Sequence, residues 1–209
     1  MNRTQSHRIS SNSAAINRQK LVHFEFDQKK YTGYEGDTLA SALLAHGIHL
    51  VGRSFKYHRP RGIFGSGSEE PNALVRLIGD KSSEPNLRAT QIEIYDGLIA
   101  ESQNRFPSLK IDFLSINNVF RRFFPAGFYY KTFMWPTSFW MFYEKLIRKA
   151  AGLGKVSKKY QESERYDHKY AHCDLLVVGS GAAGLQTAIV AAKSGARVVI
   201  ADEQHRFGG

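Results

Sequence analysis

The stretch Cys173-Asp-Leu-Leu-Val-Val-Gly-Ser-Gly-Ala-Ala-Gly184 decides the fold of the C-terminal part of this chain. Its apolar residues predict a buried strand, which runs into the pattern G-x-G-x-x-G and then into a helix. The helix is predicted over residues 185–194, with Gly195 ending it, and a second strand over residues 197–201. Strand, glycine turn, helix and strand in this order predict one βαβ unit, within the roughly 30 residues typical of it.

Each glycine of this motif has its own physical role in a dinucleotide site. Gly179 permits the tight turn out of the strand, and Gly181 leaves room for a pyrophosphate to approach the backbone. Gly184 lets the helix pack close to the strand. Free N–H groups at the helix start and the helix dipole attract phosphates. The unit therefore predicts dinucleotide binding, and the alternative is a glycine-rich turn in another kind of α/β unit.

Acidic residues follow the second strand, where a carboxylate accepts hydrogen bonds from an adenosine ribose. Asp202 has this position and Glu203 competes for it. An acid here disfavours a 2′-phosphate and favours NAD or FAD over NADP, although Arg206 weakens the distinction. The motif does not separate NAD from FAD. The predicted cofactor-binding residues are Gly179, Ser180, Gly181, Ala182, Ala183, Gly184, Asp202, Glu203, Gln204 and Gly208.

Composition bounds the remaining classes. The 209 residues suggest one or two domains, and a hydrophobic fraction of 42% suffices for a globular core. A net charge of +10 is compatible with an anionic cofactor, an acidic partner or nucleic acid, but no nucleic-acid motif supports the last. A single cysteine indicates a reducing compartment, and we expect a cytoplasmic protein. No apolar run approaches the ~20 residues of a membrane span.

The N-terminal part predicts a small β-grasp domain over residues 21–103. Alternation in Leu21-Val-His-Phe-Glu-Phe26 indicates a hairpin, and Asp37 or Thr38 is placed to cap a helix that ends at Gly47. A glycine-rich loop over 51–70 and strands at 72–78, 91–95 and 98–101 follow.

Residues 1–20 are expected to be a disordered tail. The alternative is a mitochondrial transit peptide, because the first 24 residues contain no Asp or Glu.

A connector over residues 104–171 is unusually aromatic. Twelve of the 24 residues from 120 to 143 are aromatic, but prolines and cations interrupt the run, so it is no membrane helix. We expect the rings to dock onto a further domain or a partner subunit, and the alternative is that they complete the core of the small domain. A basic helix over 144–151 and a charged linker follow, and residues 172–209 begin the dinucleotide-binding domain.

The loop over 51–70 carries a basic cluster: Arg53, Lys56, His58, Arg59 and Arg61. It is expected either to contact an anion, such as a flavin phosphate or an acidic partner surface, or to be a solvated or internally packed loop. Cys173 is expected to be a packed residue, since no activating base lies near it in sequence. The histidines lack metal-ligand spacing, so neither a metal site nor a catalytic residue is predicted.

The order of these pieces resembles the α subunit of heterotetrameric sarcosine oxidase over about residues 20–209. The residues that carry the resemblance are Gly36-Asp-Thr-Leu-Ala-Ser-Ala-Leu-Leu44, Gly52-Arg-Ser-Phe-Lys-Tyr-His-Arg-Pro-Arg-Gly62, Glu69-Glu-Pro-Asn-Ala-Leu-Val75, Lys131-Thr-Phe-Met-Trp-Pro136 and Tyr170-Ala-His-Cys-Asp174. Opine oxidase and hydrogen cyanide synthase subunits are similar in outline.

The resemblance implies a fold that is α+β and then α/β. A 2Fe-2S ferredoxin-like β-grasp domain is followed by the first βαβ unit of an incomplete Rossmann-type FAD/NAD-binding domain. Ferredoxins take cysteine ligands from the loop after the helix, and residues 47–70 contain none, so the cluster is expected to be absent.

The resemblance also implies NAD at the glycine motif, with FAD as the alternative there, and FAD and FMN in the full complex with the β, γ and δ subunits. Sarcosine would be demethylated oxidatively to glycine, with H2O2 formed and the one-carbon unit passed to tetrahydrofolate. The alternatives are an α-like subunit of an opine or amino-acid oxidase and a non-catalytic assembly scaffold. The isolated fragment is expected to be inactive.

Overall fold

The computed structural model describes residues 5–10, 16–79, 83–123, 127, 135–150, 154, 166–203 and 207–208. The chain divides into two compact units, Met1–Ser163 and Glu164–Gly209. The predicted boundary before the dinucleotide unit, between residues 171 and 172, stays a prediction.

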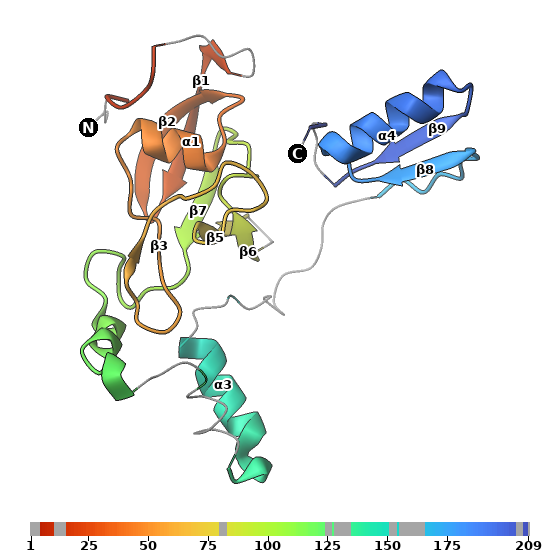
Figure 1. Ribbon diagram of the computed structural model, residues 1–209. Helices are drawn as coiled ribbons and strands as arrows, with labels where there is room; N and C mark the ends of the chain where they lie inside the picture. Colours follow the sequence, from red (N-terminus) through yellow and green to blue (C-terminus); the bar gives the residue numbers. More distant parts are fainter. Residues whose placement is uncertain are drawn as a thin grey trace. The chain divides into compact units, whose positions relative to one another are not determined.

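A five-stranded mixed sheet forms the first unit (Figure 1). Its order is β2-β1-β7-β5-β6, in which β1 and β7 are parallel and the other neighbours antiparallel. The strands are β1 (Asn17–Phe26), β2 (Lys29–Glu35), β5 (Leu74–Ile78), β6 (Ser83–Arg88) and β7 (Leu98–Ser102). Alternation along β1 turns Val22, Phe24 and Phe26 into the core.

Helix α1 (Leu39–Ala45) packs its apolar residues into the same core (Figure 1). Thr38 caps its start, because the Thr38 side chain accepts a hydrogen bond from Ser41 N at 3.2 Å. Gly47 ends it with a φ of +68°, and Gly47 N and Ile48 N close the last turn on carbonyls of the helix. Both ends lie where the sequence predicts them.

Short elements lie outside the sheet. Strands β3 (Gly52–Arg53) and β4 (Pro60–Arg61) pair antiparallel within the basic loop. The described residues of the connector include three 3-10 helices, η1 (Phe113–Asn118), η2 (Arg121–Phe123) and η3 (Thr137–Phe139), and the helix α3 (Trp140–Ala150). The basic helix predicted from residue 144 therefore starts earlier, within the aromatic run. Most of that run between 124 and 134 lies outside the described residues.

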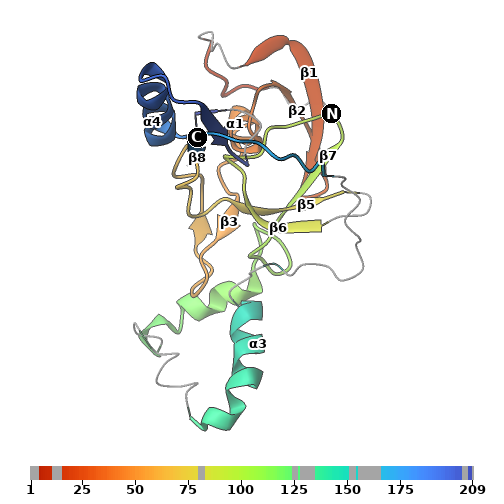
Figure 2. The ribbon, with the colours of Figure 1, turned by 90° about the vertical axis from the view of Figure 1, so that its right-hand side faces the viewer.

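Residues 91–95 differ from the predicted strand. They lie against the start of α1, with a single bridge between Glu93 and Thr38 and a hydrogen bond from Ile94 N to Asp37 O of 2.9 Å. The edge strand beside β5 is instead β6, as the turned view shows (Figure 2). The polar sequence of β6, Ser-Glu-Pro-Asn-Leu-Arg, has exposed alternate residues and gives no apolar strand signal.

The segment over residues 5–10 differs from the predicted disordered tail. Arg8 lies against the domain, where its two terminal nitrogens are 3.1 and 2.6 Å from the two carboxylate oxygens of Asp37. Asp37 is fully buried and also accepts hydrogen bonds from Tyr34 N and Ser41 Oγ. A buried carboxylate needs such partners, which explains why this segment is held.

The second unit is β8 (Leu175–Val178), α4 (Ala182–Lys193) and β9 (Val198–Ala201). The two strands pair in parallel and α4 packs against them (Figure 1). This is the βαβ arrangement predicted from the sequence, with the helix starting three residues earlier. In the described part of the chain, no helix has the length and apolar character needed to cross a membrane.

Candidate functional site

The glycine turn joins β8 to α4. Gly179 follows the strand with a φ of +99°, a left-handed conformation that favours glycine. Gly181 is the N-cap of α4, and no side chain caps the helix there. The first N–H groups of α4, at Ala182 and Ala183, have no carbonyl one turn earlier in the helix, so they point toward the turn. The geometry offers an anion a set of amide donors at the positive end of a helix.

The space around the motif glycines is unequal. A Cβ on Gly184 would lie 2.0 Å from Gly179 O, so only glycine permits this contact between helix and turn. A Cβ on Gly181 would meet nothing within 4 Å, so the backbone there faces open space. These are the geometries expected of a close helix–strand contact and of a phosphate approach. Binding itself stays a prediction.

The two acids after β9 lie differently. Asp202 Oδ2 accepts a hydrogen bond from Ser180 N at 2.5 Å, and Gly208 N donates to Ser180 O at 3.0 Å. Ser180 is fully buried, so the turn is held from both sides. Glu203 is exposed. Gln204, also predicted to bind cofactor, lies outside the described residues.

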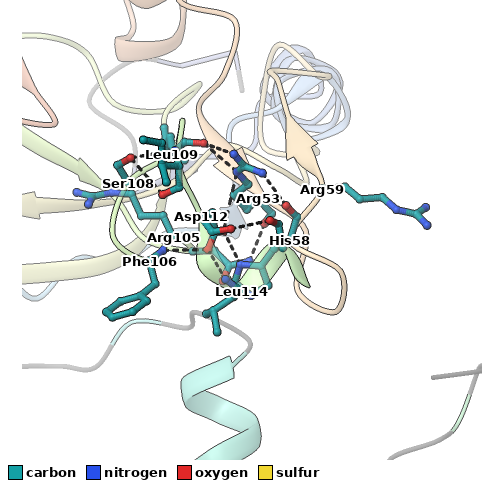
Figure 3. Close-up of polar contacts among 12 residues, drawn as sticks. Arg53, His58, Arg59, Arg105, Phe106, Ser108, Leu109, Asp112 and Leu114 are labelled. Carbon is teal, nitrogen blue, oxygen red and sulfur yellow. Dashed lines mark hydrogen bonds and ion pairs between the residues drawn. The ribbon is translucent and has the colours of Figure 1, made fainter. Parts of the chain in front are cut away.

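A buried polar cluster, here called the hub, lies in the first unit (Figure 3). His58 Nδ1 is 2.7 Å and Arg53 Nε 3.9 Å from Asp112 Oδ2. The Arg53 guanidinium donates to the carbonyls of Leu109 and His58. The other oxygen of Asp112 accepts from Leu114 N and caps η1. The hub therefore ties the basic loop to the start of the aromatic connector.

Glu70 organises the end of the basic loop. Its buried carboxylate accepts hydrogen bonds from four backbone N–H groups, at Phe64, Gly65, Asn72 and Ala73. Burial raises the pKa of Glu70, but the four hydrogen bonds outweigh it, and the pKa lies below its ordinary value. An ionised carboxylate is thus built into the loop.

The basic cluster is divided by the structure. Arg53 and His58 are internal to the hub, whereas Arg59 points away from it and Arg61 is exposed (Figure 3). Sequence reasoning missed Asp112 and Glu70. An isolated acid directly before Phe113-Leu114 is an N-cap signal that identifies Asp112 in retrospect. No local signal marks Glu70 as buried.

Family models match both units. The model of a 2Fe-2S iron-sulfur cluster binding domain matches residues 19–105, and that of an FAD binding domain matches residues 174–209. The chain therefore contains a ferredoxin-like domain followed by the start of an FAD-binding domain.

Curated relatives match nearly the whole chain. A protein named sarcosine oxidase subunit alpha from Rhizobium meliloti (strain 1021) is 53% identical over 93% of this chain and 20% of the relative. One of the same name from Corynebacterium sp. (strain U-96) is 33% identical over 94% of this chain and 16% of the relative. The chain thus spans a fifth or less of the length of these proteins.

Among solved structures, L-proline dehydrogenase from P.horikoshii is similar to this chain. The match covers 92% of this chain and 26% of the dehydrogenase chain. The two have a TM-score of 0.46 and 20% identity, a likeness that carries no inference.

The cofactor prediction is wrong. The resemblance implies NAD at the glycine motif and no iron–sulfur cluster, whereas the matched models are those of an FAD binding domain and a 2Fe-2S cluster binding domain. FAD replaces NAD as the cofactor that the comparisons support. The error arose because the motif alone does not separate the two dinucleotides, and because a cluster-binding class was set aside on cysteine count.

The residues fit the two groups differently. The open space at Gly181 and the free N–H groups of α4 fit the pyrophosphate of FAD. The single cysteine, Cys173, lies outside residues 19–105. Within the described residues, no group of three or more His, Cys, Asp or Glu side chains is placed to hold a metal ion. These residues do not fit a cysteine-held cluster.

Proposed function

We propose that the chain is part of a sarcosine oxidase α subunit. It matches the R. meliloti subunit over 93% of its own length and spans 20% of that protein. The whole protein would demethylate sarcosine oxidatively to glycine, with O2 reduced to H2O2 and the one-carbon unit passed to tetrahydrofolate. It would do so with other subunits.

This stretch would contribute the first βαβ unit of a Rossmann-type domain that holds FAD. Gly179 and Gly181 would shape the turn around the pyrophosphate, and the N–H groups of Ala182, Ala183 and Gly184 would donate to it. Glu203, or Asp202 if its contact with Ser180 N opens, would accept from the adenosine ribose. When bound, a flavin supplies two-electron redox chemistry.

The observation that carries the cofactor proposal is the contrast between Gly181 and its neighbours. The turn is fixed on one side by Gly184 against Gly179 O and on the other by Asp202 against Ser180 N. A Cβ would meet nothing within 4 Å at Gly179 or at Gly181, and of the two only Gly181, with a φ of −64°, has a backbone conformation that other residues readily adopt. A fixed turn with one open face suits a phosphate group, because the donors need no rearrangement to bind it.

The test is Gly181→Ala in the full-length protein, produced with its neighbouring subunits. The added methyl enters open space, so we expect an unchanged melting temperature and FAD content reduced at least about tenfold, since it blocks the phosphate approach. Gly97→Ala, where a φ of +85° strains any added side chain, is the control for a general loss of stability and should retain FAD. Full FAD content in Gly181→Ala would contradict the assignment.

Activity is tested separately, as oxygen consumption and peroxide formation with sarcosine, with and without tetrahydrofolate. Turnover with sarcosine supports the proposed reaction. If FAD is bound but sarcosine is not turned over, the substrate is an opine or another secondary amine. If neither FAD nor turnover is found, the protein is a non-catalytic assembly scaffold.

A further inference from the structure

A small hollow lies beside the hub, between the β3–β4 hairpin, the segment before β5 and the segment after β7. It has a volume of about 220 Å³. Arg53, Phe55, Arg61 and Asn104 line it, and the lining also includes the polar side chains of Asn72 and Gln103. None of the described residues that line it is Asp or Glu. The hollow therefore carries positive charge that no described lining carboxylate offsets.

The guanidinium groups of its two arginines differ in how many hydrogen bonds they already make within the chain. Arg53 is committed to the carbonyls of Leu109 and His58. Arg61 is held at its backbone, through pairing with Gly52 and a hydrogen bond of 3.1 Å from Val51 N to Arg61 O. No described residue forms a hydrogen bond or ion pair with its guanidinium. A fixed backbone with a free guanidinium suits a carboxylate, which arginine binds through two hydrogen bonds.

Asn104 forms a fixed part of the wall of the hollow. Its Nδ2 donates to Arg53 O at 2.7 Å, which fixes the orientation of the amide. Asn104 is 8% exposed, and its buried Oδ1 accepts no hydrogen bond from the described residues. Because this oxygen is enclosed, Asn104 shapes the wall of the hollow and offers an occupant no acceptor.

Size and the rim favour a side chain of another polypeptide. The volume is below the roughly 300–1,000 Å³ of pockets for cofactors and drug-sized ligands, but it accommodates one side chain. Phe55, at the rim, is 54% exposed. An exposed ring beside a free arginine is typical of protein interfaces, where aromatic residues and arginine are enriched.

We propose that this hollow receives an Asp or Glu side chain of another subunit, with Arg61 binding its carboxylate and Phe55 packing beside it. The proposal rests on the proposed function in taking the partner to be a further subunit of the oxidase. The positive charge of the hollow and the negative charge of the inserted side chain are complementary, which fixes the register of docking.

The test uses the full-length protein with its co-expressed subunits. Arg61→Glu should weaken subunit association at least about tenfold, and Arg61→Lys should do so less, because lysine keeps the charge but not the paired hydrogen bonds. Lys30→Glu, the same charge reversal on β2, is the control and should leave association unchanged. Association is measured by mass photometry over a dilution series.

Folding and cofactor binding are followed in the same samples. FAD content and melting temperature should be unchanged in Arg61→Glu, which separates this proposal from that for the glycine turn. Unchanged association in Arg61→Glu would overturn the docking proposal, even if FAD and sarcosine turnover are found.

A photo-cross-linking amino acid at position 55 identifies the occupant. A cross-link to an acid-containing segment of another subunit supports the proposal. A cross-link only within the same chain overturns it. Acetate tests the alternative that the hollow binds a small acid. If acetate binding to the uncomplexed protein depends on Arg61 but subunit association does not, the hollow is a small-molecule site and the proposal fails.

Discussion

The two units of the chain differ in how completely they bury their own apolar surface. In the first unit, α1 and the mixed sheet enclose a core in which Leu39 and Leu43 are 0% exposed. In the second, Leu176 is 55% and Val178 is 80% exposed, and Ile189 and Val190 of α4 are exposed as well. Parallel strands are normally covered on both faces. The first unit has the means of its own stability, whereas the second needs further polypeptide.

This contrast explains why the structure of the two units is determined by different parts of the sequence. The first is defined by a core and by buried polar groups such as Asp112 and Glu70. The second is defined by a short local motif, which forms the glycine turn although apolar side chains of β8 and α4 are still exposed. A cofactor turn is thus specified locally, while its stability is not.

The sharpest way to break the contrast is to make the same change in both units. Leu43→Ala should lower the free energy of unfolding by about 4 kcal/mol, because it leaves a cavity in a closed core. Leu176→Ala in this chain should lower it by less than about 0.5 kcal/mol, because half of the side chain is already exposed. Urea unfolding measures both.

In the full-length protein, Leu176→Ala should become costly, rising to about 2 kcal/mol or more, since further strands or helices would cover β8. An equal cost of Leu176→Ala in both lengths would show that nothing else packs on that face.

Aspartates give the next largest difference. Asp112→Ala should cost about 3 kcal/mol, because it leaves His58 and Arg53 buried without their carboxylate. Asp174→Ala, which removes an exposed side chain bonded to Arg197 N at 2.7 Å, should cost about 0.5–1 kcal/mol. Similar losses of stability in the two variants would mean that the hub contributes no more than an exposed surface hydrogen bond. Thermal unfolding with matched denaturant curves distinguishes the two.

A smaller effect depends on pH. Since the folded-state pKa of Glu70 is depressed, its contribution is complete above the ordinary glutamate pKa and is lost as the pH falls through the folded value. Glu70→Gln should therefore cost about 2 kcal/mol at neutral pH and flatten the acid limb of stability against pH. Glu84→Gln, on exposed β6, is the control and should keep the wild-type slope.

The smallest expected effect is at the exposed pair of Lys20 and Glu35 across β1 and β2. The atoms lie 2.5 Å apart, and hydrogen bonding to Glu35 raises the pKa of Lys20. Exposed ion pairs contribute little, so Lys20→Ala should leave the melting temperature unchanged within error. A clear loss would mean that the edge of the first unit depends on surface charge, contrary to the core-based account.

Sequence patterns predicted the elements whose signals are local. Thr38 and Gly47 mark the ends of α1, alternation marks β1, and the glycine motif marks the turn after β8. They failed where partners are distant in sequence. Strand β6 has no apolar pattern because it is an edge, and residues 91–95 look like a strand but lie against α1. Asp112 meets His58 across 54 residues, which no local pattern reveals.

The site was predictable to the same extent. The roles of the motif glycines followed from the pattern, but the contact of Asp202 with Ser180 N did not, because it depends on where β9 ends beside β8. The division of the basic cluster into buried and exposed members also required the fold.

The contact between Arg8 and Asp37 has a consequence for proteolytic trimming. A peptidase that removed the first ten residues would take away both guanidinium hydrogen bonds and leave Asp37 with Tyr34 N and Ser41 Oγ alone. The carboxylate sits one residue before the cap of α1, so the loss would be felt at the start of the only helix in the core cluster of the described residues. N-terminal processing and the stability of the ferredoxin-like domain are thereby linked, and a protease-resistance assay on chains cut before and after Arg8 would read that link directly.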